Sequence, residues 1–273
     1  MIFSNFWYII AAILPAIIIL IYVFKQDSFP EPREIVIKTF ILGACITLGL
    51  DLLIGDFDNF SENNLSGETY YFFDSFIRAG FLEEFFKLSI LIFYCSRKVE
   101  FDEPMDGLVY GVAASLGFAA WENIDYVLYD FQQGVYSPSF EVALVRAFSA
   151  VPMHALCGVM MGFLIAQSMF EKKYNFQNLI LALAVPVGVH GLWNYSLSSD
   201  ALSSQIASIT AFLVFLRAIF IFKDFKKRQK SKKLFHVKYY TITTNDFIKA
   251  STIVLLIFVV VNIIINLSTQ NLV

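Results

Sequence analysis

Eight long apolar segments constrain this chain more than any other feature of its sequence. Each has about 20 or more mostly apolar residues, the length that a helix needs to cross the hydrocarbon core of a bilayer. They cover residues 6–24, 35–54, 72–95, 107–128, 140–169, 178–198, 202–222 and 248–267. We therefore expect an all-α polytopic membrane protein, a bundle of about eight transmembrane helices that forms a single transmembrane domain over residues 1–273.

The composition agrees with this expectation and excludes several classes of protein. Of the 273 residues, 58% are hydrophobic and 16% are charged, whereas a soluble domain has about 45–50% apolar and about 25% charged residues. One soluble core could not bury so much apolar surface. The composition therefore excludes a soluble enzyme, a nucleic-acid-binding protein and a disordered regulator.

The Lys and Arg residues predict the orientation, because the cytoplasmic loops of membrane proteins are enriched in them. Sixteen of the twenty basic residues lie in or beside four loops, at 25–34, 96–106, 170–177 and 223–247. The loops near 55–69, 129–139 and 199–201 contain acidic residues and no basic ones. We expect the basic loops in the cytosol and both termini outside. The basic run from Lys223 to Lys233 is interpreted as a contact with anionic lipid rather than with nucleic acid.

Ionisable groups cost about 2.5–3.5 kcal/mol each at the centre of an inserted helix and are therefore candidate functional groups. Four of the apolar segments carry clusters of such polar residues at helical spacing. Segment 72–95 carries Glu83 and Glu84, with Lys87 within one helical turn. A buried Glu–Lys pair would account for one of these glutamates but not for both. Segment 107–128 carries Glu122, which has no basic residue within one turn. Its partner must come from another helix or be a metal ion.

The other two of these segments each carry one histidine. His154 precedes Gly158 by one turn, so it lies near a face suited to close helix packing. His190 precedes Asn194 by one turn and shares a helix face with it. A single histidine in a span is often a hydrogen-bonded packing residue, and that alternative stays open for each. Arg146, two turns before His154, is expected to pair with an acidic residue near the outer surface.

Depth connects the four segments. At a rise of 1.5 Å per residue, Glu83, Glu122, His154 and His190 lie about 20–27 Å from the basic or polar cytosolic boundaries of their segments. We therefore expect one buried polar site. Imidazoles and carboxylates are zinc ligands, and a catalytic zinc keeps three protein ligands and an open position for water. Without a metal, a Glu–His pair can activate water directly. Both alternatives predict hydrolysis of a bond inside the membrane.

Four motifs follow one another on consecutive segments: Glu83-Glu84-x-x-Lys87, Phe118-x-x-x-Glu122-Asn123, His154-x-x-x-Gly158 and His190-x-x-x-Asn194. In this order they resemble the PrsW family of bacterial intramembrane proteases, which is related to the CAAX prenyl endopeptidases and the bacteriocin-processing proteins. The resemblance covers about residues 70–200. It implies an integral protein of the bacterial cytoplasmic membrane that cleaves membrane-anchored proteins such as anti-sigma factors, either as a metalloprotease or as a glutamate-type peptidase.

The resemblance also implies roles for the polar residues. Glu83 and Glu84 carry over as the catalytic acids, and His154 and His190 as water activators or metal ligands. Glu122 joins them as a ligand or second base, at a position where the wider superfamily commonly has a histidine. A zinc ion would then be held by Glu122, His154 and His190, together with Glu83 or Glu84.

Two further residues receive supporting roles. Asn194 is expected to stabilise the oxyanion of the transition state, because an amide donor there would act on charge that develops only at that point. Lys87 is expected to pair with a glutamate and to set its ionisation.

Two other functions use similar residues. A proton-coupled transporter or channel also has carboxylates and histidines inside its spans, although this sequence shows no inverted repeat that would favour one. A non-catalytic relative could bind membrane proteins in the same pocket without cutting them.

Overall fold

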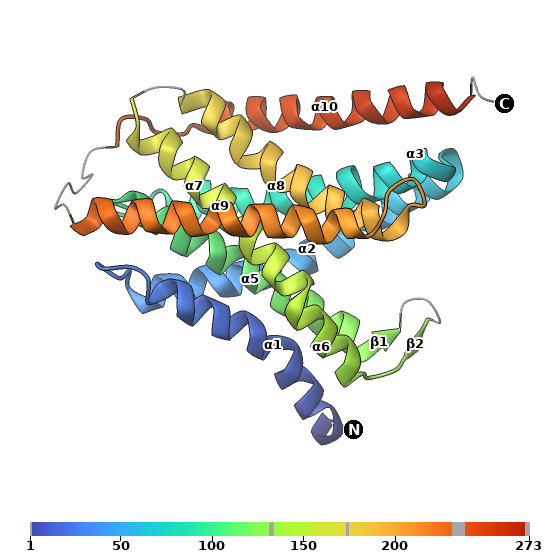
Figure 1. Cartoon of the computed structure of the whole chain (residues 1–273), viewed down its shortest axis with the longest axis horizontal. Coiled ribbons are helices and arrows are strands. Elements are labelled where there is room, and N and C mark those ends of the chain that lie inside the picture. The colour runs from blue at the N-terminus through green and yellow to red at the C-terminus, as the bar shows by residue number, and fades with distance from the viewer. Residues whose placement is uncertain (1, 131–133, 173–174, 231–237, 271–273) are drawn as a thin grey trace.

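All eight apolar segments fold into helices in the computed structural model, which describes residues 2–130, 134–172, 175–230 and 238–270 (Figure 1). The first half of the chain contains α1 (Ile2–Phe24), α2 (Arg33–Asn64), α3 (Gly67–Phe72), the π-helix η1 (Phe73–Phe81), α4 (Leu82–Ile90), the π-helix η2 (Leu91–Cys95) and α5 (Pro104–Leu128). An antiparallel hairpin of β1 (Tyr129–Asp130) and β2 (Val135–Tyr136) follows. The second half contains α6 (Phe140–Phe148), α7 (Ala150–Phe170), α8 (Asn175–Ser198), α9 (Gln205–Lys230) and α10 (Thr244–Gln270).

By length and composition, five helical stretches can cross a membrane, and a sixth is added if the two halves of α2, bent by 47°, count as one span. The five are Asn5–Phe24, Phe140–Phe170, Asn175–Ser198, Gln205–Lys230 and Thr244–Ser268. The expected count of eight is therefore approximate. Segments 72–95 and 107–128 are absent from the five because the first is divided among shorter helices and the second, α5, is rich in small and polar residues. Those residues suit a helix that is surrounded by protein rather than lipid.

Helix α5 is the centre of the bundle, and most of its side chains are buried. Glycines allow it to approach α7 closely, as their spacing predicts. A Cβ atom on Gly162 would lie 1.9 Å from the carbonyl oxygen of Gly107, and one on Gly111 would lie 2.4 Å from that of Gly158. On the other side of α5, a Cβ atom on Gly117 would lie 1.9 Å from the carbonyl oxygen of Phe40 in α2. Backbone contact thus fixes where α5 and α7 lie relative to each other.

The long segment 140–169 is not one continuous helix. It is divided at Ser149, whose φ of −122° and ψ of −81° interrupt the helix between α6 and α7. The hydroxyl of Ser149 donates to the carbonyl of Val145 at 2.7 Å, a side-chain bond that competes with the backbone ladder and bends helices. Together α6 and α7 still form one apolar stretch, Phe140–Phe170, that is long enough to cross a membrane.

The basic loops connect helices at one end of the bundle. The C-terminal ends of α1 and α9 lie at the left of Figure 1, whereas the N-terminal end of α1 and the C-terminal end of α10 lie at the right. Parts of two basic loops, residues 173–174 and 231–237 with Lys232, Lys233 and the third histidine, His236, lie outside the described residues. The outer helices α1, α9 and α10 expose large apolar side chains, among them Trp7, Phe212 and Leu256, as expected for surfaces that face lipid.

Candidate active site

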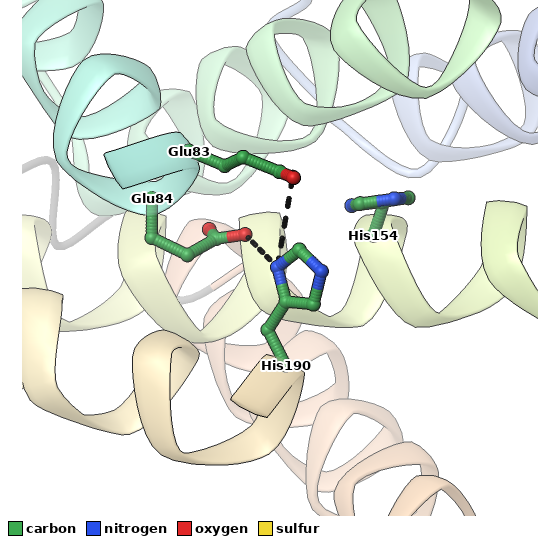
Figure 2. Close-up of side chains that lie close together, drawn as sticks. All are labelled: Glu83, Glu84, His154 and His190. Atoms are coloured by element: carbon green, nitrogen blue, oxygen red, sulfur yellow. Dashed lines mark hydrogen bonds and ion pairs between the residues drawn. The ribbon is translucent and has the colours of Figure 1, made fainter. Parts of the chain in front are cut away.

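Glu83 and Glu84 lie in the first turn of α4, directly after the nine residues of η1. Short π-helical stretches are often found at functional sites because they change the register of the residues that follow. Adjacent helix positions project about 100° apart, yet both carboxylates turn toward one ring in Figure 2. Nδ1 of His190 lies 3.0 Å from Oε1 of Glu84 and 3.8 Å from Oε2 of Glu83. Both glutamate side chains are long enough to reach the same ring, although their Cα–Cβ bonds point in different directions.

His154 faces the same group of residues from α7. Its ring centroid lies 5.0 Å from that of His190, and the two rings are nearly perpendicular. Glu83, Glu84, His154 and His190 each offer one ligand atom, and these four atoms all lie within 4.8 Å of one another. The structure therefore brings together residues of α4, α7 and α8 that are up to 107 positions apart in the chain. All four side chains are buried or nearly so.

Lys87 lies inside this group and is fully buried. Its Nζ donates to Oε1 of Glu84 at 2.8 Å and to Oε2 of Glu83 at 3.4 Å. It also lies 3.2 Å from Nδ1 of His154 and 3.9 Å from the ring centroid of Phe118. The lysine therefore contacts both glutamates rather than one of them, and it supplies the positive charge that a buried pair of carboxylates requires.

Glu122 is not part of this group. Its Oε2 accepts from Nη2 of Arg146 at 2.5 Å and lies 3.1 Å from Nε2 of His154. Nε of Arg146 donates to Oδ1 of Asn123 at 2.6 Å, and Nδ2 of Asn123 donates to the carbonyl of Ala12 at 3.1 Å. The partner of Glu122 thus comes from another helix, α6. Arg146 pairs with the partly buried Glu122, beside His154, instead of with a carboxylate near the outer surface.

The contacts of His154 assign its tautomer. A carboxylate only accepts hydrogen bonds and an ammonium group only donates them. Nε2, which faces Glu122, must therefore carry the proton, and Nδ1, which faces Lys87, must be the acceptor. A carboxylate that holds one ring nitrogen in this way is the usual neighbour of a metal-binding histidine, because it fixes the tautomer and the ring orientation.

Asn194 lies one turn after His190 on α8 and is half-buried. Within the described ranges it makes no hydrogen bond to Glu83, Glu84, His154 or His190. Arg146 is not among the site residues predicted from the sequence. The sequence feature that could have indicated it is its position two turns before His154.

The donor set fits a metal such as zinc, which prefers imidazole and carboxylate ligands. Oε2 of Glu84 is buried and has no hydrogen-bond partner within the part of the chain that the structure describes, so this atom has an unused acceptor. Glu84, His154 and His190 would hold the ion, which leaves Glu83 free beside it. Glu122 would lie behind His154. Lys87 contacts the same lone pair of His154, so the ammonium and a metal would compete for it.

Comparisons with known proteins decide the family. The sequence profile described as PrsW family intramembrane metalloprotease matches residues 31–222. The chain belongs to this family. The matched region begins before and ends after the motifs that carry the resemblance. It includes every helix that contributes to the group of Glu83, Glu84, His154 and His190. PrsW proteins are proteases, so the chain is a membrane-embedded hydrolase rather than a transporter.

Curated relatives cover most of the chain. A protein named Protease PrsW from Bacillus subtilis is 39% identical over 208 residues, which are 76% of this chain and 88% of that protein. One from Oceanobacillus iheyensis is 34% identical over 216 residues, 78% of this chain and 92% of that protein. One from Clostridioides difficile is 30% identical and covers 82% of this chain. No solved structure gives a significant match.

Proposed function

We propose that this chain is an intramembrane endopeptidase that hydrolyses a peptide bond of membrane-anchored proteins of the anti-sigma-factor type. One observation carries the proposal: two carboxylates, two imidazoles and one ammonium group meet inside a bundle of membrane helices, where lipid would otherwise surround them. Such groups are retained in spans where they perform a function. The printed name of the relatives, Protease PrsW, supports peptide-bond hydrolysis.

Glu83 is the better candidate for the general base. Its side chain is 11% exposed, and its contacts with Lys87 and His190 are long, at 3.4 and 3.8 Å. The side chain of Glu84 is fully buried and is held by the same two residues at 2.8 and 3.0 Å. A base must reach water and must be free to take its proton. Glu83 meets both conditions, whereas Glu84 is fixed as a charged anchor for Lys87 and His190.

The reaction then follows from these positions. Glu83 takes a proton from a water molecule whose oxygen adds to the carbonyl carbon of the scissile bond. The same carboxyl group then gives the proton to the amide nitrogen as the C–N bond breaks. Asn194, on the same face of α8 as His190, is proposed as a donor to the oxyanion. Arg146 and Glu122 keep His154 in the tautomer whose Nδ1 accepts.

The proposed metal is zinc, held by Glu84, His154 and His190, with Glu122 orienting His154 and Glu83 left free as the base. When bound, zinc would supply Lewis acidity at the carbonyl and lower the pKa of a nearby water. We further propose that the basic loops lie in the cytosol of a bacterial cell and that both termini lie outside its cytoplasmic membrane.

The test is cleavage of a tagged single-span substrate by the purified protein in liposomes, followed by gel. Glu83→Gln should lower the rate by about 10²–10⁴-fold, because the amide keeps the shape but cannot take a proton. Glu84→Gln should also abolish cleavage, because it removes the partner of Lys87 and His190. Glu62→Gln, an exposed glutamate of α2, serves as the matched control and should cleave normally.

Two results would contradict parts of this account. Full activity of the double variant Glu83→Gln, Glu84→Gln would refute the catalytic roles. Cleavage that continues in the presence of a chelator would exclude zinc from the mechanism. The water would then be activated by glutamate alone. We expect the opposite, loss of cleavage with chelator and recovery with added Zn²⁺.

A further inference from the structure

A second group of carboxylates lies at the end of the bundle that carries the basic loops. Asp27 and Glu31 belong to the connection between α1 and α2, whereas Glu103 and Asp106 belong to the start of α5. Their exposed fractions are only 8%, 6%, 5% and 0%. None of the four forms an ion pair with Lys or Arg among the described residues, although basic residues are abundant at this end. Buried negative charge of this kind needs a partner.

Hydrogen bonds account for part of the group. Oδ2 of Asp106 accepts from the backbone nitrogens of Asp102 and Glu103, at 2.8 and 2.7 Å, and caps α5. Gln229 from the end of α9 donates through Nε2 to Oδ1 of Asp27, at 2.7 Å, and to Oε1 of Glu103. These contacts bring three distant parts of the chain together, but all the donors are neutral.

Two buried oxygen atoms have no partner. Oδ2 of Asp27 and Oδ1 of Asp106 make no hydrogen bond within the part of the chain that the structure describes. One carboxylate oxygen from each of Asp27, Glu103 and Asp106 lies within 4.8 Å of the other two. Three carboxylates from two connections therefore converge, and two of them keep an unused acceptor buried in the protein.

The crowding of negative charge also affects ionisation. Burial, and after it the neighbouring carboxylates, raises the pKa of Glu103 to about 7. Burial likewise raises the pKa of Glu31, whose carboxylate accepts a hydrogen bond from Tyr110. Burial thus favours the neutral form of these carboxyl groups, whereas a bound divalent cation would favour the charged form that can act as a ligand.

We propose that Asp27, Glu103 and Asp106 bind a hard divalent cation, Mg²⁺ or Ca²⁺, which joins the α1–α2 connection to the start of α5. The group contains only oxygen ligands, with no His or Cys, and such a set selects Mg²⁺ or Ca²⁺ over zinc. The site is separate from the catalytic group. Asp106 precedes Phe118, whose ring contacts Lys87 of the catalytic group, by twelve residues of the same helix, which is about 18 Å at 1.5 Å per residue.

The probe is Mn²⁺, measured by electron paramagnetic resonance on the purified full-length protein in detergent. The double variant Glu83→Gln, Glu84→Gln is the background, so that the catalytic group does not contribute. We expect one bound Mn²⁺ per chain, displaced by excess Mg²⁺ or Ca²⁺. Adding Asp27→Asn, which keeps an oxygen acceptor for Gln229, should weaken Mn²⁺ binding at least tenfold. Adding Glu100→Gln, an exposed neighbour on the same loop as Glu103, should leave it unchanged.

If the Asp27→Asn variant does not fold, Glu103→Gln replaces it, with the same expected loss of Mn²⁺ binding. Divalent cations should also raise the melting temperature of the background protein. They should leave unchanged the melting temperature of the protein that carries Asp27→Asn or Glu103→Gln in addition. Protonation alone could neutralise the group, and then the background protein would bind no Mn²⁺. That result, or equal Mn²⁺ binding with and without Asp27→Asn, would overturn the proposal.

Discussion

Replacing Gly158 by Ala tests whether the crossing of α5 and α7 positions the catalytic group. Gly158 lies one turn after His154, and a Cβ atom there would lie 2.5 Å from the carbonyl oxygen of Gly111. An ordinary contact begins at 3.4 Å, so the helices must separate by the difference, 3.4 − 2.5 = 0.9 Å. The nearest obstructing atoms, the carbonyl oxygen and carbon of Gly111, are backbone and cannot turn aside as the nearby hydroxyl of Ser115 could.

The expected free-energy change combines two opposing effects. Overpacking costs about 1–3 kcal/mol, and rigid backbone places this case near the upper value. Alanine recovers about 1 kcal/mol over glycine in a helix. We therefore expect Gly158→Ala to lower the free energy of unfolding by about 2 kcal/mol. A displacement near 1 Å at a reacting group can lower the rate by about 10²-fold, and His154 is close enough to Gly158 to move with the crossing.

Gly188→Ala is the matched control. Gly188 lies two residues before His190 on α8, and a Cβ atom there would meet nothing within 4 Å. This variant should gain up to about 1 kcal/mol and cleave at the normal rate. The assays are unfolding in a denaturing detergent titration and cleavage of the tagged substrate. Equal stability and equal cleavage for the two variants would refute the argument that backbone contact sets the site.

Two further predictions use other parts of the structure. Arg146→Gln should lower cleavage much more than Arg146→Lys, because the glutamine leaves Glu122 without a cation in a largely buried site, and kinetics that are the same for both variants would show that Arg146 does not act through its charge. For the orientation, a cysteine introduced at Asn63 should react with an impermeant reagent added outside the cell, whereas one at Lys230 should not. The reverse labelling would invert the topology.

The sequence predicts the helices well because their signal is local. Hydropathy along a segment depends only on that segment, and each of the eight apolar runs is helical in the structure. The break at Ser149 could not be predicted, because the residues on both sides are apolar and serine is tolerated inside helices. The break is accompanied by a side-chain hydrogen bond from Ser149 to the carbonyl of Val145, which no hydropathy pattern reveals.

The candidate site was predictable in part for the same reason. Spacing and depth predict one polar site of Glu83, Glu84, Glu122, His154 and His190, and the structure groups all of these except Glu122. Spacing does not indicate which helix supplies the partner of Glu122, because Arg146 lies 24 positions away in the chain and on another helix. The second group of carboxylates was also missed, since its members come from loops and helix ends without a periodic pattern.

Lys87 has a consequence for how the protein enters the membrane. It contacts Glu83 and Glu84 within one turn of the same helix, so one of the two negative charges is matched as soon as α4 forms. During insertion the helix therefore carries a single net negative charge. Its insertion costs the free energy of one unmatched ion rather than of three. That last charge finds its partner on α8 only when the bundle has closed. The catalytic group is therefore complete only at the end of membrane insertion. A partly inserted chain does not yet have it.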